Sequence, residues 1–120
     1  MGSRKIAVVI DAADVDALRA FWVAALRYEP HAAFEQYRSA VPADGADGPK
    51  LMFQQVAEQR QAAKNRLHID IAVGDELEAE CARLIELGAT RLSQPIAEAG
   101  TEWIVMADPE GNEFCLVHHH

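Results

Sequence analysis

The sequence predicts an α+β fold that consists of two tandem βαβββ units. Each half of the 120-residue chain contains one segment with the apolar period of an amphipathic helix, flanked by segments in which apolar and polar residues alternate. The halves superimpose when the first is shifted by 61 residues, so that Ile6 meets Leu67. We therefore expect one domain over residues 1–117, with unit one at about 4–57 and unit two at about 66–117.

The first unit begins with an expected strand at 4–11. Asp14 has the side chain of a helix N-cap, and the helix that follows should reach about Tyr28, because Pro30 disfavours helical backbone at the residue before it. The buried face of this helix is predicted from i, i+3, i+4, i+7 spacing as Leu18, Phe21, Trp22 and Ala25. The remaining elements are two short strands within 31–41, a loop at 42–49 and a strand at 50–56.

The second unit repeats this order from the strand at 67–73. Asp75, followed three residues later by the acid Glu78, predicts an N-cap, and the helix should end near Leu87 with Gly88 after it. Its buried face is predicted as Leu77, Cys81, Leu84 and Ile85. After it we expect a strand at 90–94, a loop at 95–100, a strand at 101–107, a turn at 108–112 and a strand at 113–117.

The repeat also assigns the two faces of each sheet. Strand side chains alternate with a period of two, so the apolar face of each first strand should meet its helix. The opposite face should line any concavity that the sheets enclose. That face is predicted to carry Ala7, Val9, Asp11, Met52, Gln54 and Val56 in unit one, and His68, Asp70, Ala72, Glu113, Cys115 and Val117 in unit two.

Composition excludes several classes of function. The formal net charge of −8 argues against non-specific binding to nucleic acid, which depends on basic patches. No apolar run is long enough to cross a membrane. Cys81 and Cys115 form no disulfide framework, so a cytoplasmic protein with reduced thiols is expected. We interpret residues 118–120, three histidines, as a tag remnant and leave them out of metal arguments.

The expected strand at 67–73 contains the first candidate site residue, His68. It is open to interpretation as a metal ligand, a general base, a ligand-binding group or a structural histidine. Asp70 lies two residues on and is expected to be a neighbour of His68 rather than its partner. Glu113 and Asp11 are candidate acids or bases, or solvated carboxylates.

The other candidates would shape a ligand pocket. Cys115 is a possible zinc ligand or nucleophile, with a small core residue as the alternative. Trp103 and Met106 have opposite parity on one strand, so only one of them faces the cavity, and Trp103 is the better aromatic wall. Cys81 is expected in the core.

Four motifs then stand out, one in the first unit and three in the second. They are Phe21-Trp22 in the first helix, Leu67-His68-Ile69-Asp70, Leu87-Gly88-Ala89-Thr90, and Asp108-Pro109-Glu110-Gly111-Asn112-Glu113-Phe114.

With these motifs the chain resembles, over residues 4–117, the vicinal oxygen chelate superfamily, the group of glyoxalases and bleomycin resistance proteins. The closest likeness is to its small glyoxalase-like domain proteins. The resemblance implies a curved, incompletely closed mixed sheet around a cavity, and a homodimer. It also implies four metal-ligand positions, which carry over to Ala7, Gln54, His68 and Cys115. Only His68 is the usual ligand type, so we expect no metal cofactor, with a divalent metal on His68 and Cys115 as the weaker alternative.

Two functions remain as hypotheses. In the first, the protein binds a small organic molecule, which it sequesters or carries, beside a degenerate metal site, with Asp11, Gln54, Trp103 and Cys115 as ligand-binding residues. In the second, it is a lyase or isomerase that transfers protons through His68 with Asp70 or Glu113, either without metal or with a non-standard metal site. Whether the protein is an enzyme is left open.

Overall fold

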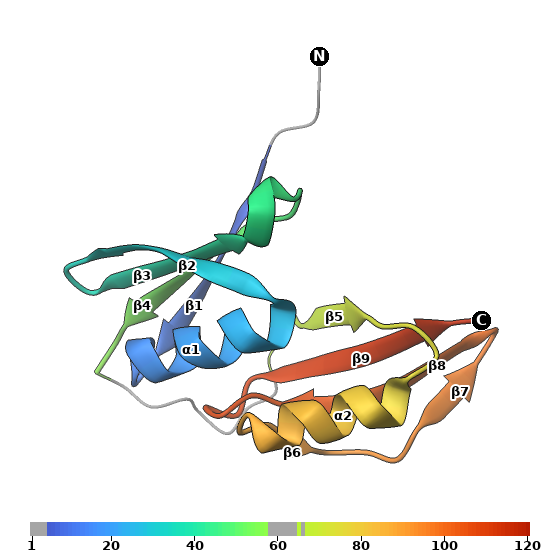
Figure 1. The fold of residues 1–120 in the computed structure, drawn as a ribbon. Coiled ribbons are helices and arrows are strands. Elements are labelled where there is room, and N and C mark those ends of the chain that lie inside the picture. Colours follow the sequence, from blue (N-terminus) through green and yellow to red (C-terminus); the bar gives the residue numbers. More distant parts are fainter. Residues whose placement is uncertain (1–4, 58–64, 66) are drawn as a thin grey trace. The chain divides into compact units, whose positions relative to one another are not determined.

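A computed structural model describes residues 5–57, 65 and 67–120, which fall into two compact units, Met1–Arg60 and Gln61–His120 (Figure 1). Both units combine one helix with one mixed sheet, which confirms the α+β class. The predicted limits at residues 4 and 66, and most of the connection at 57–65, lie outside the described residues. No helix in the described ranges is long and apolar enough to cross a membrane.

The first unit has the predicted βαβββ order. Its sheet runs β1-β4-β3-β2, with β1 and β4 parallel and the other neighbours antiparallel. The apolar Leu51 and Phe53 of β4 are buried, while Met52 and Gln54 alternate with them on the other face. The elements are β1 (Ala7–Ala12), α1 (Val15–Leu26), β2 (Tyr28–Phe34), β3 (Tyr37–Pro42), the short 3₁₀ turn η1 (Ala43–Gly45) and β4 (Lys50–Gln55).

Helix α1 starts where its sequence predicts and ends earlier. The Ala17 N–H donates to Asp14 Oδ1 over 3.1 Å, and the predicted stripe Leu18, Phe21, Trp22 and Ala25 is buried. The expected end near Tyr28 is wrong, because Arg27 adopts a left-handed conformation (φ 57°) that stops the helix at Leu26. Pro30 therefore lies in β2, an edge strand, where a residue without an N–H is tolerated.

The second unit has the same plan with one extra short strand. Its sheet runs β5-β9-β8-β6, with β7 also paired to β8, and β5 and β9 are parallel. The expected loop at 95–100 contains a strand, and the expected strand at 90–94 is reduced to two residues. The elements are β5 (Ile69–Ala72), α2 (Leu77–Glu86), β6 (Thr90–Arg91), β7 (Ile96–Glu98), β8 (Thr101–Ala107) and β9 (Glu113–His119).

Two details of α2 correct the sequence prediction. The N-cap is Glu76 rather than Asp75, and its side chain makes no capping hydrogen bond. Ile85 is 45% exposed, while Leu77, Cys81 and Leu84 are buried as predicted. The C-terminal end agrees with expectation, because Gly88 takes a positive φ of 117° and the Ala89 N–H donates to the Leu84 carbonyl, as in a Schellman motif.

The pairing register of the parallel strands differs between the units. Ile69 pairs with Phe114, so the shift of 61 residues predicts that Val8 pairs with Phe53. In the structure Phe53 pairs with Ile10, two residues further on. A slip of two residues leaves every side chain on its own face, because the side-chain period of a strand is two. The apolar pattern is therefore preserved although the neighbours across the strands change.

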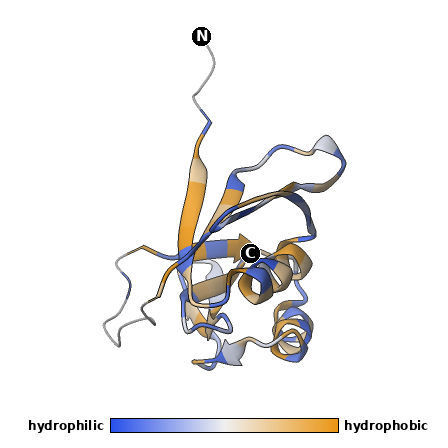
Figure 2. Ribbon diagram, turned by 90° about the vertical axis from the view of Figure 1, so that its left-hand side faces the viewer, coloured by the Kyte–Doolittle hydropathy of each residue, from blue (hydrophilic) through white to orange (hydrophobic). Residues whose placement is uncertain are grey.

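Strand β1 carries apolar side chains on both faces, whereas a strand that is covered on one side only usually has polar side chains on its exposed face. Figure 2 shows a hydrophobic run along β1, which begins after a short hydrophilic stretch. Val8 and Ile10 are half-buried, whereas Val9, on the opposite face, is exposed.

At the other end of the chain, β9 extends two residues beyond the predicted strand, because Thr101 pairs with His119 and Glu102 with His118.

Candidate functional site

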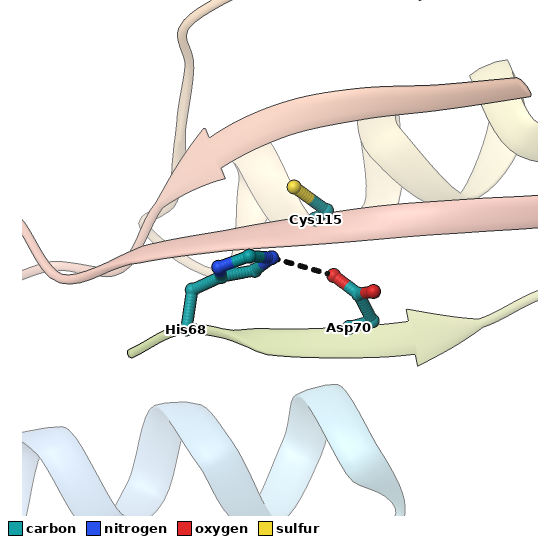
Figure 3. A group of neighbouring side chains, drawn as sticks. All are labelled: His68, Asp70 and Cys115. Atoms are coloured by element: carbon teal, nitrogen blue, oxygen red, sulfur yellow. Dashed lines mark ion pairs between the residues drawn. The ribbon is translucent and has the colours of Figure 1, made fainter. Parts of the chain in front are cut away.

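The most concentrated group of reactive side chains lies where β5 meets β9. These strands are parallel, and Asp70 is the direct partner of Cys115 across them. His68 precedes Asp70 by two residues and lies just before β5. Figure 3 shows the three side chains on the same side of the two strands. The sequence placed all three on one face from alternation alone, and the structure brings them together.

His68 and Asp70 form an ion pair with each other. His68 Nε2 lies 3.0 Å from Asp70 Oδ1 (Figure 3), and the two side chains are 51% and 58% exposed. The expectation that Asp70 is only a neighbour of His68 is therefore wrong. The reason is that a residue at i+2 on a strand points to the same side, where an imidazole is long enough to reach a carboxylate. The carboxylate holds one ring nitrogen and leaves Nδ1 for other contacts.

The same group contains three types of metal ligand. One ligand atom from each of His68, Asp70 and Cys115 lies within 4.8 Å of the others. Asp70 is not among the four family positions, of which Ala7 has no donor atom and Gln54 offers only a neutral amide. The family's four-ligand set therefore does not fit this chain, whereas a set drawn from unit two alone does fit a divalent metal. These three side chains are the ones that would hold it.

The two cysteines differ in their surroundings. Cys81 is 1% exposed on the inner face of α2, and burial raises the pKa of its thiol above the ordinary value. Cys81 is therefore a protonated core residue, as predicted. Cys115 is only half-buried and lies beside Asp70 on the helix-free face.

Trp103 and Glu113 lie on the same sheet face as Cys115. Val105 of β8 pairs with Cys115, and Trp103, two residues earlier, pairs with Val117. Met106 on the same strand is fully buried in the core, so Trp103 faces the opposite side of the sheet, as its position in the strand predicted. Glu113 pairs with Ala107 and is two residues from Cys115 along β9. Both remain candidates for contact with a ligand at this face.

Asp11 and Gln54 belong to the first unit, where they are neighbours. They pair across the parallel strands β1 and β4, and Gln54 is also opposite Tyr37 of β3. Asp11 is exposed and Gln54 is half-buried. The structure thus places a carboxylate beside an amide on the face opposite α1.

A hollow of about 330 Å³ lies in the first unit. Met52 and Ser39 pair across β4 and β3, on the face opposite to the buried Leu51 and Phe53, and both line it. Its polar lining includes His31, Tyr37 and Lys50, which the sequence analysis did not select. Alternation along 50–56 already placed Lys50 beside Met52 and Gln54, whereas the register of 31–41 was not predictable. The full lining is His31, Ala32, Phe34, Tyr37, Ser39, Lys50 and Met52.

Comparisons with known proteins agree with this geometry. The sequence profile of the glyoxalase-like domain family matches residues 7–117. A glyoxalase/bleomycin resistance protein/dioxygenase family enzyme from Burkholderia phytofirmans PsJN is 17% identical, with a TM-score of 0.78 over 94% of this chain and 96% of that one. The fosfomycin resistance protein FosX from Listeria monocytogenes is 16% identical, with a TM-score of 0.79 over 100% and 96%.

A third structure, a member of the glyoxalase/bleomycin resistance protein/dioxygenase superfamily from Sphaerobacter thermophilus, is 20% identical, with a TM-score of 0.69 over 98% of both chains. No curated protein matches the sequence. Similarity at these identities shows the fold, and the profile covers nearly the whole chain. The predicted resemblance is confirmed by this profile and by the fold of the solved structures: the chain belongs to the glyoxalase-like domain family.

Proposed function

We propose that this protein binds a small organic molecule, which it sequesters or carries. The observation that carries the proposal is the hollow in unit one. Its volume of about 330 Å³ is at the lower end of the range of small-molecule pockets, roughly 300–1,000 Å³. The side chains of Phe34 and Met52 provide an apolar wall, and His31, Tyr37 and Lys50 provide a few polar groups, the combination that such pockets use.

The charge of the lining favours an organic anion. Lys50 is exposed and has no acidic partner among the residues that the structure describes. Its ammonium group is therefore available to a carboxylate. His31 and Tyr37 can add hydrogen bonds from the same hollow, while Phe34 contacts an apolar or aromatic body. A small aromatic carboxylic acid satisfies all of these groups.

Replacing Lys50 tests this assignment. In a thermal-shift screen of small aromatic carboxylic acids, we expect ligands that stabilise the wild type to bind Lys50→Ala at least about tenfold more weakly, because a hydrogen bond to a charged group contributes about 1.5–3 kcal/mol. Lys50→Arg keeps the positive charge and is the matched control, with affinity near that of the wild type. Unchanged affinity of Lys50→Ala for every ligand found would contradict the assignment.

A lyase or isomerase is the second candidate, favoured by the ion pair of His68 and Asp70. A carboxylate that holds one imidazole nitrogen sets the tautomer of the ring, so that Nδ1 can exchange a proton with a bound substrate. Glu113 on the same face is the other acid that could take part. The reaction would then occur at unit two, with Trp103 as an apolar wall.

Chemical conversion distinguishes the enzyme from the carrier. Each ligand found in the screen is incubated with the protein and analysed by mass spectrometry and NMR, since an isomer keeps its mass. An enzyme that uses His68 should convert at least one ligand, and His68→Gln should slow the conversion by about 10²–10⁴-fold. Recovery of every ligand unchanged from the wild type would eliminate the second candidate.

A homodimer in the cytoplasm fits both candidates. Among the described residues, β1 and β5 each lie at one end of the sheet of their own unit, with a strand partner on one side. Exposed apolar side chains such as Val9 and Phe34 add surface that a second copy would cover. The thiols of Cys81 and Cys115, both unbridged, are compatible with a reducing compartment.

A further inference from the structure

The hairpin of β2 and β3 contains an irregularity that shapes the hollow of unit one (Figure 1). Two residues of β2, His31 and Ala32, lie opposite the single residue Ser39 of β3, which is the arrangement of a β-bulge. We propose that Ser39 and Arg19 hold this bulge and are thereby positioning residues for the ligand of the hollow. The inference rests on the proposed function of that hollow.

The bulge allows His31 and Phe34 to share one face of the sheet. They are three positions apart, so in a regular strand, whose side chains alternate with a period of two, they would point to opposite faces. Here both line the hollow, together with Ala32 between them. The register shift between Pro30 and Ala33 supplies the extra residue that this arrangement requires. A regular strand would therefore remove from the hollow either its imidazole or its aromatic wall.

The bulge residue Ala32 is held through both of its backbone polar groups. Its N–H donates to Ser39 Oγ over 3.1 Å, and its carbonyl accepts from Arg19 Nη1 over 3.2 Å. The same nitrogen of Arg19 also donates to the Ser39 carbonyl over 3.4 Å. A bulge disrupts the hydrogen-bond ladder at the extra residue, and here two side chains supply the partners that the ladder does not.

The two side chains come from different elements of unit one. Ser39 belongs to β3, is only 4% exposed and itself lines the hollow, so its hydroxyl needs a protein partner, which the Ala32 N–H provides. Arg19 belongs to α1 and joins the helix to the edge strand β2. Loss of either side chain would leave a backbone group of Ala32 without its partner and would favour a regular strand.

Nuclear Overhauser effects (NOEs) show which face each ring occupies, and they require no ligand. In the wild type, the His31 ring should show NOEs to the side chain at position 39, and the Phe34 ring should show NOEs to its strand partner Tyr37. In Ser39→Ala, one of these two sets should disappear, because the residue that leaves the bulge turns to the face that α1 covers.

Three further variants make the comparison specific. Ser39→Thr keeps a hydroxyl and should keep both sets of NOEs. Ser93→Ala is the matched control in unit two, because it removes a hydroxyl that accepts the Val105 N–H over 3.0 Å but does not line the hollow. It should leave both sets unchanged. Arg19→Met removes the donor to the Ala32 carbonyl, should act as Ser39→Ala does, and supplies the test if Ser39→Ala fails to fold.

Titration with benzoate, a small aromatic carboxylate, connects the bulge to binding. Ser39→Ala should bind benzoate about two- to tenfold more weakly than the wild type, because it lacks one hydrogen bond that holds the bulge. Ser39→Thr and Ser93→Ala should bind benzoate as the wild type does. Failure of the wild type to bind benzoate would count against the proposed function, and the NOEs would still decide the inference.

Three results would overturn the inference. One is that both sets of NOEs persist in Ser39→Ala and in Arg19→Met. Another is that Ser39→Thr loses the same NOEs as Ser39→Ala, which would make the shape of the side chain responsible rather than its hydroxyl. The third is a benzoate affinity of Ser39→Ala equal to that of a wild type that binds benzoate.

Discussion

Replacing Asp108 by alanine should lower the free energy of unfolding by about 3 kcal/mol. The side chain is 2% exposed, and its Oδ1 accepts the Glu110 N–H and the Asn112 N–H, both over 2.9 Å. Asn112 Nδ2 donates to Oδ2 over 3.0 Å. The substitution would leave these donors without their charged acceptor in a turn that closes β8 onto β9. Urea unfolding followed by circular dichroism measures the loss.

The isosteric variant separates the hydrogen bonds from the shape of the side chain. Asp108→Asn keeps one oxygen, which can still accept both backbone N–H groups, so its destabilisation should be about half as large. Because Ala107 pairs with Glu113 across this turn, the change should also disturb the strand that carries Cys115. A cost below about 1 kcal/mol for Asp108→Ala would show that the turn holds without the carboxylate.

Leu84→Ala should destabilise the protein by about 2–5 kcal/mol, whereas Ile85→Ala should change its stability by about 0.5 kcal/mol or less. Leu84 is 0% exposed, so truncation removes buried apolar surface and leaves a cavity in the core. Ile85 is 45% exposed and loses little. Both substitutions introduce the same residue into the same helix, so helix propensity affects them similarly.

The pair of variants tests the corrected orientation of α2. Denaturation midpoints and slopes in urea, measured side by side, give the two differences in unfolding free energy. Equal decreases in the unfolding free energy of the two variants would show that Ile85 is buried in the core, as the apolar period of the sequence predicted.

Local chemistry predicted the helices well and their ends less well. The stripe of α1 and the positive φ of Gly88 follow from residue type and spacing, and both are present. At the start of α2 two consecutive acids, Asp75 and Glu76, offer two possible caps, and sequence does not choose between them. Pro30 showed only how far α1 could extend. The helix ends earlier, because Arg27 adopts a left-handed conformation.

The hollow of unit one depended on long-range pairing that sequence does not show. Arg38 and Ser39 of β3 are assigned to opposite faces by their partners Phe53 and Met52. Segment 31–41 has no clear alternation, and β2 contains a register shift between Pro30 and Ala33. His31 therefore could not be assigned to the ligand-binding face before its strand partners were known.

The sequence by itself determined the fold family and the face of each site residue. A period of two places His68, Asp70 and Cys115 on the side of the sheet away from α2, whatever the register. Only the tertiary structure decided which of these side chains meet. Asp70 lies beside Cys115 in unit two, whereas the slip of two residues in unit one puts Gln54 beside Asp11 rather than beside Val9, the repeat mate of Asp70. The physical reason is that burial of apolar side chains selects a face but is unchanged by a shift of two residues, so backbone pairing across the whole sheet must select the neighbours.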